Sequence, residues 1–345
     1  MAAIMAASLA ACTVAAPRTV APTVTATAET QPVGTRGDAA DDPAIWVNAA
    51  APGESLVIGT DKKGGLAVYR LDGSLRQFLP IGRVNNVDVR DGFPLGGRTV
   101  PIVTASDRDR NAIVIYTIAP DTLELVDVTD GVVGTNLSEI YGLCMYVEPS
   151  SGRHYVFVND KDGRYQQHEL EPRPAGRVGA RLVREFRLGG QPEGCAADDV
   201  TGWLYVGEET RGFFRVRAAA DAPAQLELVD EVGTGHLVAD VEGIAIHAKA
   251  DGTGYIVVSS QGDDAFAIYA RAPGNAFVGR FRVTAGAFDG VSGTDGLDVT
   301  SAALPAPYEH GLLVVQDDAN TAPRAPQNFK LVPWRDVQQV IPPRR

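Results

Sequence analysis

Short acidic segments at the start of apolar strands are the residues of this sequence best suited to chemistry. The stretch ADVEGIAI (239–246) has the apolar residues of a buried strand, yet it begins with the carboxylates of Asp240 and Glu242, followed by Gly243. Carboxylates can bind cations or exchange protons, but on a single strand they can also simply face water. Gly243 would let the backbone pass close to a crowded channel wall. A recurrence of the pattern would distinguish a site from an accident.

The pattern recurs six times along the chain. Each copy is a polar residue, usually followed by glycine and then a short strand, and the copies start at Asp42, Asn86, Tyr141, Glu193, Glu242 and Asp295. Consecutive copies lie 44 to 55 residues apart. A repeat of about fifty residues made of strands is typical of one β-propeller blade, whereas an irregular β-sandwich would not give such even spacing. We therefore expect an all-β fold, a six-bladed β-propeller with antiparallel strands around a central channel.

A second polar position follows each copy by 16 to 22 residues, at the end of the next apolar strand. It is occupied by Lys62, Arg108, Lys161, Glu209, Gln261 and Gln316. In an antiparallel pair, the start of the first strand lies beside the end of the second. Both polar sets should therefore meet at one rim of the propeller, around the mouth of its channel.

The expected rim is rich in carboxylates. The candidate metal ligands among them are Asp41, Asp42, Asp162, Glu193, Glu208, Glu209, Asp240, Glu242, Asp289, Asp295 and Asp317. So many carboxylates would repel one another and raise one another's pKa values unless a cation neutralised them. Oxygen ligands without a cysteine or histidine cluster favour calcium or magnesium, and calcium suits a flexible oxygen-only site better. The alternative, that each carboxylate faces water singly, fits poorly with the equivalent repeat positions of several of them.

The basic residues beside these carboxylates are suited to an anion. Lys62, Arg108 and Lys161 take like places in three successive blades. Arginine binds phosphate through paired hydrogen bonds, lysine provides a point charge, and a divalent metal bridges phosphate oxygens. The sequence has no histidine-phosphatase motif, C-x5-R loop, G-x4-GK[ST] loop or G-x-S-x-G elbow. Because no side-chain nucleophile stands out, metal-activated water is the expected attacker of a phosphate ester.

Charge and the N-terminus bear on the partners and the compartment. The 345-residue chain has a net charge of −12, which argues against nucleic acid or an anionic membrane as a partner. Residues 1–17 are small and apolar and contain Leu9-Ala10-Ala11-Cys12, the pattern of a bacterial lipoprotein signal. Residues 18–37 are expected to be a flexible linker and residues 38–341 the propeller. We expect an exported monomer, either a periplasmic or outer-membrane-anchored lipoprotein held by a lipid on Cys12, or a secreted protein.

Two further cysteines, Cys144 and Cys195, remain after Cys12. In an exported protein such a pair can form a disulfide, and two buried free thiols are the equal alternative. Only the distance between the two residues decides between these states.

Several segments in combination resemble the β-propeller phytases. They are DDPAIWV (41–47), GTDKKGGLAVY (59–69), NNVDVR (85–90), YGLC (141–144), EGCAADD (193–199), DVEGIAI (240–246), SSQGDDAFAIY (259–269), TDGLDV (294–299) and QNFKLVPW (327–334). The resemblance runs in order from about residue 38 to residue 341. It implies a calcium-dependent enzyme that removes phosphates from myo-inositol hexakisphosphate (phytate), presented as its calcium complex.

The matching motifs also imply roles for individual residues. Contacts to substrate phosphates are implied for Lys62, Arg108, Tyr141 and Lys161, with Gln261 lining the cleft. Calcium binding in the cleft is implied for Asp42, Glu193, Glu209, Asp240, Glu242 and Asp295, and calcium that stabilises the fold for Asp289, Asp317 and Asn320. The residues expected to be catalytic are Lys62, Arg108, Tyr141, Lys161 and Glu209.

The sequence departs from the family pattern at two places. Asp162 follows Lys161 where a glutamate is expected, and Cys144 and Cys195 occupy positions that are apolar in some members. Their place in successive blades implies a bridge between blades. Two other functions stay open: another metal-dependent propeller hydrolase, lactonase-like or phosphotriesterase-like, and a non-catalytic calcium-binding propeller. The first would act on neutral esters without the three cations, and the second would release no phosphate.

Overall fold

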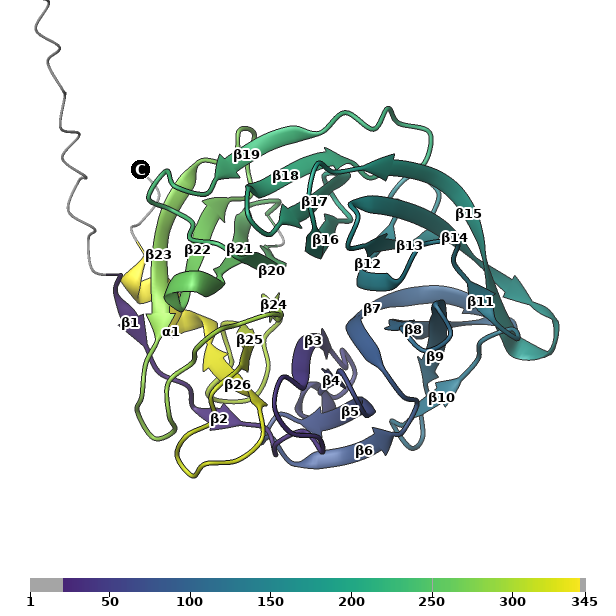
Figure 1. Ribbon diagram of the computed structural model, residues 1–345. Helices are drawn as coiled ribbons and strands as arrows, with labels where there is room; N and C mark the ends of the chain where they lie inside the picture. The colour runs from purple at the N-terminus through teal and green to yellow at the C-terminus, as the bar shows by residue number, and fades with distance from the viewer. Residues whose placement is uncertain (1–20, 250, 342–345) are drawn as a thin grey trace, which may run out of the picture.

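Six sheets form a closed ring of blades around a central opening in the computed structural model, which describes residues 21–249 and 251–341 (Figure 1). Within each blade, neighbouring strands in the sheet are consecutive in the chain and pair antiparallel, apart from additions at the outer edges. The expected six-bladed, all-β propeller is thereby confirmed.

The first three blades each begin with a strand at the channel and add the following strands outward. Blade 1 contains β3 (Ala40–Trp46), β4 (Leu56–Asp61), β5 (Gly65–Arg70) and β6 (Leu75–Leu79). Blade 2 contains β7 (Val84–Leu95), β8 (Arg98–Asp107), β9 (Ala112–Ile118), and the edge strands β10 (Leu125–Asp127) and β11 (Val133–Gly134), which both pair with β9. Blade 3 contains β12 (Ile140–Val147), β13 (His154–Asp160), β14 (Arg164–Arg173) and β15 (Arg177–Arg187).

The last three blades follow the same plan, and two of them take an extra strand from the N-terminus. Blade 4 contains β16 (Pro192–Asp198), β17 (Trp203–Glu208), β18 (Gly212–Arg217) and β19 (Glu227–Glu231). Blade 5 contains β20 (Val241–Ala248), β21 (Gly254–Ser260), β22 (Ala265–Ala270), β23 (Phe277–Val283) and β1 (Thr23–Val24). Blade 6 contains β24 (Leu297–Thr300), β25 (Leu312–Asp317), β26 (Asn328–Pro333) and β2 (Ala28–Glu29). The helical segments of the described chain are α1 (Trp334–Val340) and the 3-10 turns Pro52–Glu54, Pro174–Gly176 and Gln261–Asp263.

The second strand of a blade is apolar along most of its length because neighbouring blades cover both of its faces. Every residue of β4, β13 and β21 is buried. The outermost strand β6, in contrast, has no buried residue. A strand that is buried on both faces forms a continuous apolar run rather than an alternating one, which is the pattern that marked these strands in the sequence.

The hydrophobic core is divided into six clusters, one between each pair of neighbouring blades. The cluster between blades 3 and 4 packs Phe157 of β13 with Val206 of β17. Across the same seam, Cys144 of β12 and Cys195 of β16 form a disulfide, with their Cα atoms 5.7 Å apart. The implied bridge between blades is confirmed, and the alternative of two free thiols is set aside.

The segment before the propeller differs from the flexible linker expected for residues 18–37. Within its described part, β1 pairs in parallel with β23 of blade 5 and β2 pairs antiparallel with β26 of blade 6. Glu29 of β2 also forms an ion pair with the buried side chain of Lys330. The expectation was wrong here because the Thr, Val and Ala residues that suggest a linker are also strand formers, and the open edges of two blades offer them unpaired backbone groups. We call residues 21–30 the N-terminal strap.

The expected signal segment, residues 1–17 with Cys12, lies outside the described residues. Among the residues that the structure does describe, no helix is both long enough and apolar enough to span a membrane.

Removing the strap should weaken the closure of the ring. A chain that begins at Gln31 is expected to melt at least about 5 °C below a chain that begins at Ala21, because two strand edges and one of the three carboxylate partners of buried Lys330 are lost. Thermal unfolding followed by circular dichroism measures the difference. Equal melting temperatures would show that the strap only decorates blades 5 and 6.

Candidate active site

The inner strands of blades 1 to 5 share a bulge close to their start. In each, the pairing with the second strand slips by one residue, between Ala40 and Pro43, Val84 and Val87, Ile140 and Leu143, Pro192 and Cys195, and Val241 and Ile244. A bulge turns a side chain away from the regular sheet, and bulges are frequent beside active sites. In each inner strand, one polar residue stands two positions before the residue at which regular pairing resumes. These residues are Asp41, Asn85, Tyr141, Glu193 and Glu242, and Asp295 has the equivalent position two residues before β24. We call these six the rim residues.

This register corrects the sequence alignment of the repeats by one residue in blades 1 and 2. The rim positions belong to Asp41 and Asn85, whereas Asp42 and Asn86 take the place that glycine has in the other blades. Asp42 Oδ2 accepts a hydrogen bond from the backbone N–H of Val87 (3.2 Å) and so joins blade 1 to blade 2. The expected calcium ligand Asp42 thus lies among the groups that bond neighbouring blades.

The glycines after the rim residues allow the blades to approach one another closely. A Cβ atom on Gly142 would lie 2.0 Å from the carbonyl oxygen of Glu193, and one on Gly194 would lie 2.3 Å from that of Glu242. A Cβ atom on Gly243 would lie 2.7 Å from the carbonyl oxygen of Asp295. No side chain fits at these distances, which confirms the role expected for Gly243 and explains how the rim side chains crowd one mouth.

The second set of polar residues expected at the rim lies at the ends of the second strands of the blades, β4, β8, β13, β17, β21 and β25. Their last residues are Asp61, Asp107, Asp160, Glu208, Ser260 and Asp317, and the residues that follow are Lys62, Arg108, Lys161, Glu209, Gln261 and Asp318. Asp107 Oδ1, for example, accepts hydrogen bonds from two backbone N–H groups of the turn after it. The aspartates that end these strands accept hydrogen bonds from backbone N–H groups of the turns after them, whereas Oε2 of Glu208 has no hydrogen-bond partner among the described residues. Five of the six residues that follow the strands are the ones expected at the rim. In blade 6 the equivalent is Asp318, whereas Gln316 accepts a hydrogen bond from the N–H of Asp295 (2.8 Å).

Glu193 is the carboxylate on which four blades converge. Its Oε2 accepts a hydrogen bond from the Tyr141 hydroxyl (2.5 Å) and its Oε1 accepts one from Asn85 Nδ2 (2.6 Å). One carboxylate oxygen from each of Glu193, Glu209 and Glu242 lies within 4.8 Å of the other two. The structure therefore brings together three of the expected metal ligands from blades 4 and 5.

The carboxylates at this mouth lack the partners that ionised groups need. Burial, followed by the charge of Glu193, raises the pKa of Glu242 well above its usual value and that of Glu209 to about 7. Burial also raises the pKa of Asp41 well above its usual value and that of Asp295 to about 6. Among the described residues, both side-chain oxygens of Asp41 and Oε2 of Glu242 are buried without a hydrogen-bond partner. Buried oxygens short of positive charge are the donor set that Ca²⁺ prefers, so these residues fit a calcium ion.

Lys62 supplies part of the missing charge on one side of the mouth. Its Nζ lies 2.7 Å from Asp295 Oδ2, 2.7 Å from Asp38 Oδ1 and 3.6 Å from Asp41 Oδ2. Burial alone would lower the pKa of Lys62, but the neighbouring carboxylates raise it, so the ammonium stays charged. Gln261 Nε2 donates to Asp295 Oδ1 (2.6 Å), which holds the same carboxylate from a second side.

Arg108 and Lys161 flank the ring of Tyr141 on the other side. The Arg108 guanidinium carbon lies 5.6 Å and Lys161 Nζ lies 4.3 Å from the ring centre. Arg108 donates to Glu139 Oε1 through Nε (3.1 Å) and Nη2 (2.7 Å). Lys161 is exposed, and among the described residues no carboxylate lies within 4 Å of its Nζ. Two of the three cations expected to bind phosphate, Arg108 and Lys161, thus stand side by side, and the ammonium of Lys161 has no carboxylate partner among the described residues.

Sequence reasoning missed Glu139 and Gln191. Glu139 accepts hydrogen bonds from Arg108, and these bonds together with the charge of Arg108 lower the pKa of the Glu139 carboxyl. Gln191 Nε2 donates to Glu209 Oε1 (2.5 Å). Each residue stands two positions before a rim residue, Tyr141 or Glu193, and that recurring place was the signal that could have identified them.

Three other expected metal ligands lie at or outside the edge of this group. Glu208 is buried beside Gly190, and its nearest cation is Arg211, 3.9 Å away. Asp162 is exposed and accepts a hydrogen bond from Ser138 Oγ (3.4 Å). Asp240 stands close enough for its charge to contribute to the raised pKa of Glu209.

Asp289 and Asp317, two of the three residues expected to bind a stabilising calcium ion, face a lysine of the chain itself. Buried Lys330 Nζ contacts a carboxylate oxygen of Asp289 and lies 3.4 Å from Asp317 Oδ2. Asn320 donates through Nδ2 to the carbonyl of Pro326 (3.0 Å). Lys330 provides one ammonium for three carboxylates, those of Glu29, Asp289 and Asp317. Among the described residues, Asp317 Oδ2 and Asn320 Oδ1 are buried without a hydrogen-bond partner, so the stabilising calcium site stays a prediction.

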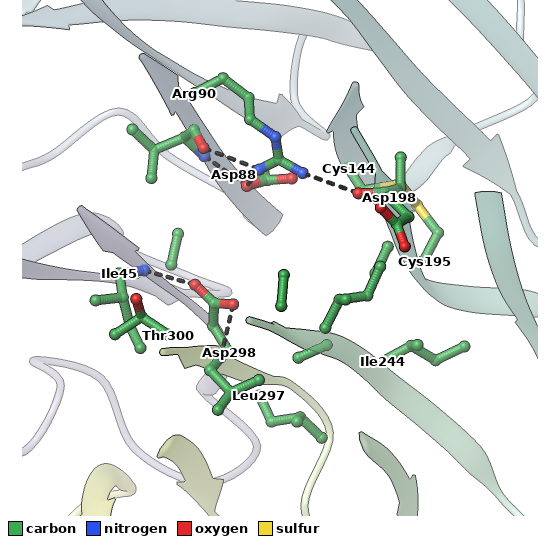
Figure 2. Close-up of a pocket in the computed structure, with 18 of the residues that line it drawn as sticks. Ile45, Asp88, Arg90, Cys144, Cys195, Asp198, Ile244, Leu297, Asp298 and Thr300 are labelled. Atoms are coloured by element: carbon green, nitrogen blue, oxygen red, sulfur yellow. Dashed lines mark hydrogen bonds and ion pairs between the residues drawn. A yellow bond between two sulfur atoms is a disulfide. The ribbon is translucent and has the colours of Figure 1, made fainter. Parts of the chain in front are cut away.

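The opposite half of the channel provides a contrast. A cavity of about 360 Å³ there is lined by Asp88, Arg90 and Asp298, among others (Figure 2). Asp88 Oδ2 accepts from the N–H of Met145 (2.8 Å) and Asp298 Oδ2 from that of Ile45 (2.7 Å), so each carboxylate bonds to the next blade. Arg90 Nη1 donates to Asp88 Oδ1 (2.6 Å). Carboxylates in this half have hydrogen-bond and ion-pair partners within the fold, which favours the other mouth as the candidate site.

Comparison with known proteins shows the family of this chain. The chain matches the family model described as Phytase over residues 1–343. A 3-phytase of Bacillus subtilis (strain 168) is 41% identical over 323 residues, which cover 92% of this chain and 85% of that protein. The chain belongs to the phytase family. As a member, the enzyme is a hydrolase, and the lactonase-like and non-catalytic alternatives are set aside.

Two solved structures are more distantly similar to this phytase-family enzyme. One is a functionally unknown protein from Desulfotomaculum acetoxidans DSM 771, with 12% identity, a TM-score of 0.45, and coverage of 69% of this chain and 70% of that one. The other is the Cps50 (Swd1) β-propeller domain of Myceliophthora thermophila, with 11% identity, a TM-score of 0.44, and coverage of 85% and 82%. At these scores neither bears on the function of the enzyme.

Neutralising Glu209 should stabilise the metal-free enzyme in a pH-dependent way. Because folding raises the pKa of Glu209 to about 7, its contribution to stability is present below the unfolded value of about 4.5 and is lost as the pH rises through 7. In metal-free protein, Glu209→Gln should therefore raise the free energy of unfolding by about 1 kcal/mol at pH 8, after screening of this half-buried group, and leave it unchanged near pH 4.5.

Chemical denaturation of metal-free protein at the two pH values measures this effect. Glu54→Gln, which changes an exposed glutamate of blade 1, is the matched control and should shift neither value. A Glu209→Gln effect of the same size at both pH values would show that charge repulsion at the mouth is not its cause.

Proposed function

We propose that this enzyme removes phosphate groups from phytate by a calcium-dependent attack of water. The observation that carries the proposal is the juxtaposition, at one channel mouth, of buried carboxylates that lack a cation with the side chains of Arg108 and Lys161. Family membership supplies the reaction class, and the relative from Bacillus subtilis is a 3-phytase. The charge pattern supports calcium as the cofactor and a phosphorylated substrate.

Glu193, Glu209 and Glu242 would hold the ion most directly, with Asp41, Asp240 and Asp295 beside them. Their carboxylate oxygens are hard ligands, and the orphaned buried oxygens of Asp41 and Glu242 indicate that a positive partner completes this group. When bound, calcium would lower the pKa of a water molecule and offset negative charge on phosphate oxygens. Without a cation, the same group would repel the polyanionic substrate.

The remaining residues bind the substrate and hold the ligands in place. Arg108 can hydrogen-bond two phosphate oxygens and Lys161 can place its free ammonium against a third, which would stabilise charge as it develops in transfer. The Tyr141 hydroxyl and Asn85 Nδ2 hold the carboxylate of Glu193. Lys62 fixes Asp295 at the edge of the group. Glu209 is the half-exposed member of the three glutamates, and we assign to it the orientation of the attacking water.

The disulfide bears on the compartment. Structural disulfides persist in oxidising environments, so the Cys144–Cys195 bond indicates an exported protein. We propose that residues 1–17 direct export, that a lipid on Cys12 or release into the medium sets the final location, and that the enzyme acts as a monomer. Globomycin-sensitive processing and labelling of Cys12 with a fatty-acid analogue would separate the lipoprotein from the secreted form.

Calcium removal should abolish phosphate release. In excess EGTA, the release of inorganic phosphate from phytate is expected to fall to background and to return when calcium is added back. The melting temperature should fall in parallel, because an ion at 100 times its dissociation constant stabilises the folded state by about 2.7 kcal/mol. Full activity in EGTA would overturn the calcium proposal.

Lys161 should contribute to binding of phosphate by its charge. Lys161→Met is expected to raise KM for phytate about tenfold, equivalent to about 1.4 kcal/mol, because the mouth loses its free ammonium. Lys249→Met, which removes the same charge above Tyr255 on the far part of blade 5, should leave KM unchanged. Equal effects of the two variants would mean that the enzyme senses net charge rather than this contact.

A further inference from the structure

The Cys144–Cys195 disulfide joins the two inner strands that carry Tyr141 and Glu193. Cys144 follows Tyr141 by three residues on β12, and Cys195 follows Glu193 by two residues on β16. At about 3.3 Å of rise per residue, the bond lies about 7–10 Å behind the contact between the Tyr141 hydroxyl and Glu193. The covalent bond and the rim contact are thus two points on one pair of strands.

The seam between β12 and β16 depends on side chains. Within the described ranges, no backbone–backbone hydrogen bond joins the two strands. Blades 5 and 6, in contrast, are joined near the rim by the N–H of Gly243 and the carbonyl of Asp295 (2.6 Å). Near the rim, the bonds across the seam of blades 3 and 4 run from Asn159 Nδ2 to the Glu193 carbonyl (3.1 Å) and from the Tyr141 hydroxyl to the Glu193 carboxylate. At the other end of the same strands, the N–H of Val147 donates to Asp199 Oδ1 (2.9 Å). The disulfide is the covalent link across this seam.

The position of Glu193 affects several other residues of the candidate site. It contacts Asn85 of blade 2 and Tyr141 of blade 3, and its charge contributes to the raised pKa values of Glu209 and Glu242. A sliding of β16 against β12 would change the spacing of the three glutamates together. Metal sites and catalytic groups lose function when their ligands shift by about 1 Å, so this seam is sensitive.

We propose that the Cys144–Cys195 disulfide positions Glu193 for calcium binding, so that the enzyme reaches full activity only when this bond is formed. The inference rests on the proposed calcium function. Because the bond forms in oxidising compartments, the enzyme would stay less active before export, while Cys144 and Cys195 are still reduced. Glu193 would remain at the rim of the reduced protein, but its carboxylate would be held less firmly against Glu209 and Glu242.

Reduction is chemically accessible from the far half of the channel. Both cysteines line the cavity of Figure 2, and Cys195 is 8% exposed. A dithiol such as dithiothreitol would attack one sulfur as its thiolate, break the S–S bond and close to its own cyclic disulfide, leaving Cys144 and Cys195 as two thiols. Two electrons and two protons pass from the dithiol to the protein. The bond would thus be reduced from one side of the ring, and the change in calcium binding would occur at the opposite mouth.

The test compares calcium dependence with and without the bond. The double variant Cys144→Ala/Cys195→Ala should need at least about threefold more calcium for half-maximal release of phosphate from phytate, and should turn over more slowly at saturating calcium, at a temperature well below its melting point. Leu331→Ala, which creates a cavity in the core between blades 6 and 1, is the control for lost stability. This variant should have a lower melting temperature and an unchanged calcium titration.

A second arm uses the wild-type chain and does not depend on folding of the double variant. Wild type treated with dithiothreitol, with a gain of two thiols per chain over the untreated protein confirmed by Ellman titration, should show the same shift in calcium dependence, and reoxidation should reverse it. A reduced protein or double variant that melts earlier but keeps the wild-type calcium titration and turnover would overturn the inference while leaving the calcium function intact. Wild-type activity that is indifferent to calcium would overturn the proposed calcium function and this inference with it.

Discussion

Charge repulsion among carboxylates at one channel mouth is the constraint on which the rest of the structure depends. Glu193, Glu209 and Glu242 lie within 4.8 Å of one another, and burial raises the pKa values of the latter two. At the other end of the same channel, Asp88 and Asp298 accept hydrogen bonds from backbone N–H groups of neighbouring blades. Carboxylates therefore bond backbone groups of neighbouring blades in one half, whereas in the other half oxygens of Asp41 and Glu242 have no hydrogen-bond partner among the described residues. The presence or absence of an internal partner makes the difference.

Ring closure produces this crowding. The glycines after the rim residues let each inner strand approach the next so closely that no Cβ atom would fit. The bulge at the start of each inner strand points a side chain into the mouth, where it meets side chains of blades that are distant in the sequence. Glu193 of blade 4 thus meets Asn85 of blade 2, 108 residues earlier in the chain. The site exists only in the closed ring, and the strap, the seam cores and the disulfide are contacts that hold the ring closed.

The distribution of charge around the ring matches a substrate that carries many phosphates. Arg108 and Lys161 come from blades 2 and 3, next to the Tyr141 ring, and the glutamates come from blades 4 and 5. A cation held by the glutamates would complete a surface that is positive on both sides of a phosphate ester. The net charge of −12 then belongs to the metal-free chain, and the mouth becomes an anion site once its carboxylates are neutralised.

The repeat of about fifty residues and its apolar runs were enough to determine the six blades from the sequence alone, and the position after each second strand was enough to align Lys62, Arg108, Lys161 and Glu209. Strand periodicity is local, so it survives in the sequence. The inner bulge is not local: it adds one unpaired residue, so Asp41 and not Asp42 stands at the rim. Likewise, only the tertiary structure showed that Lys330 neutralises Asp289 and that residues 21–30 join two blades. Which charges have partners depends on blades brought together by ring closure, and no spacing along the chain encodes that.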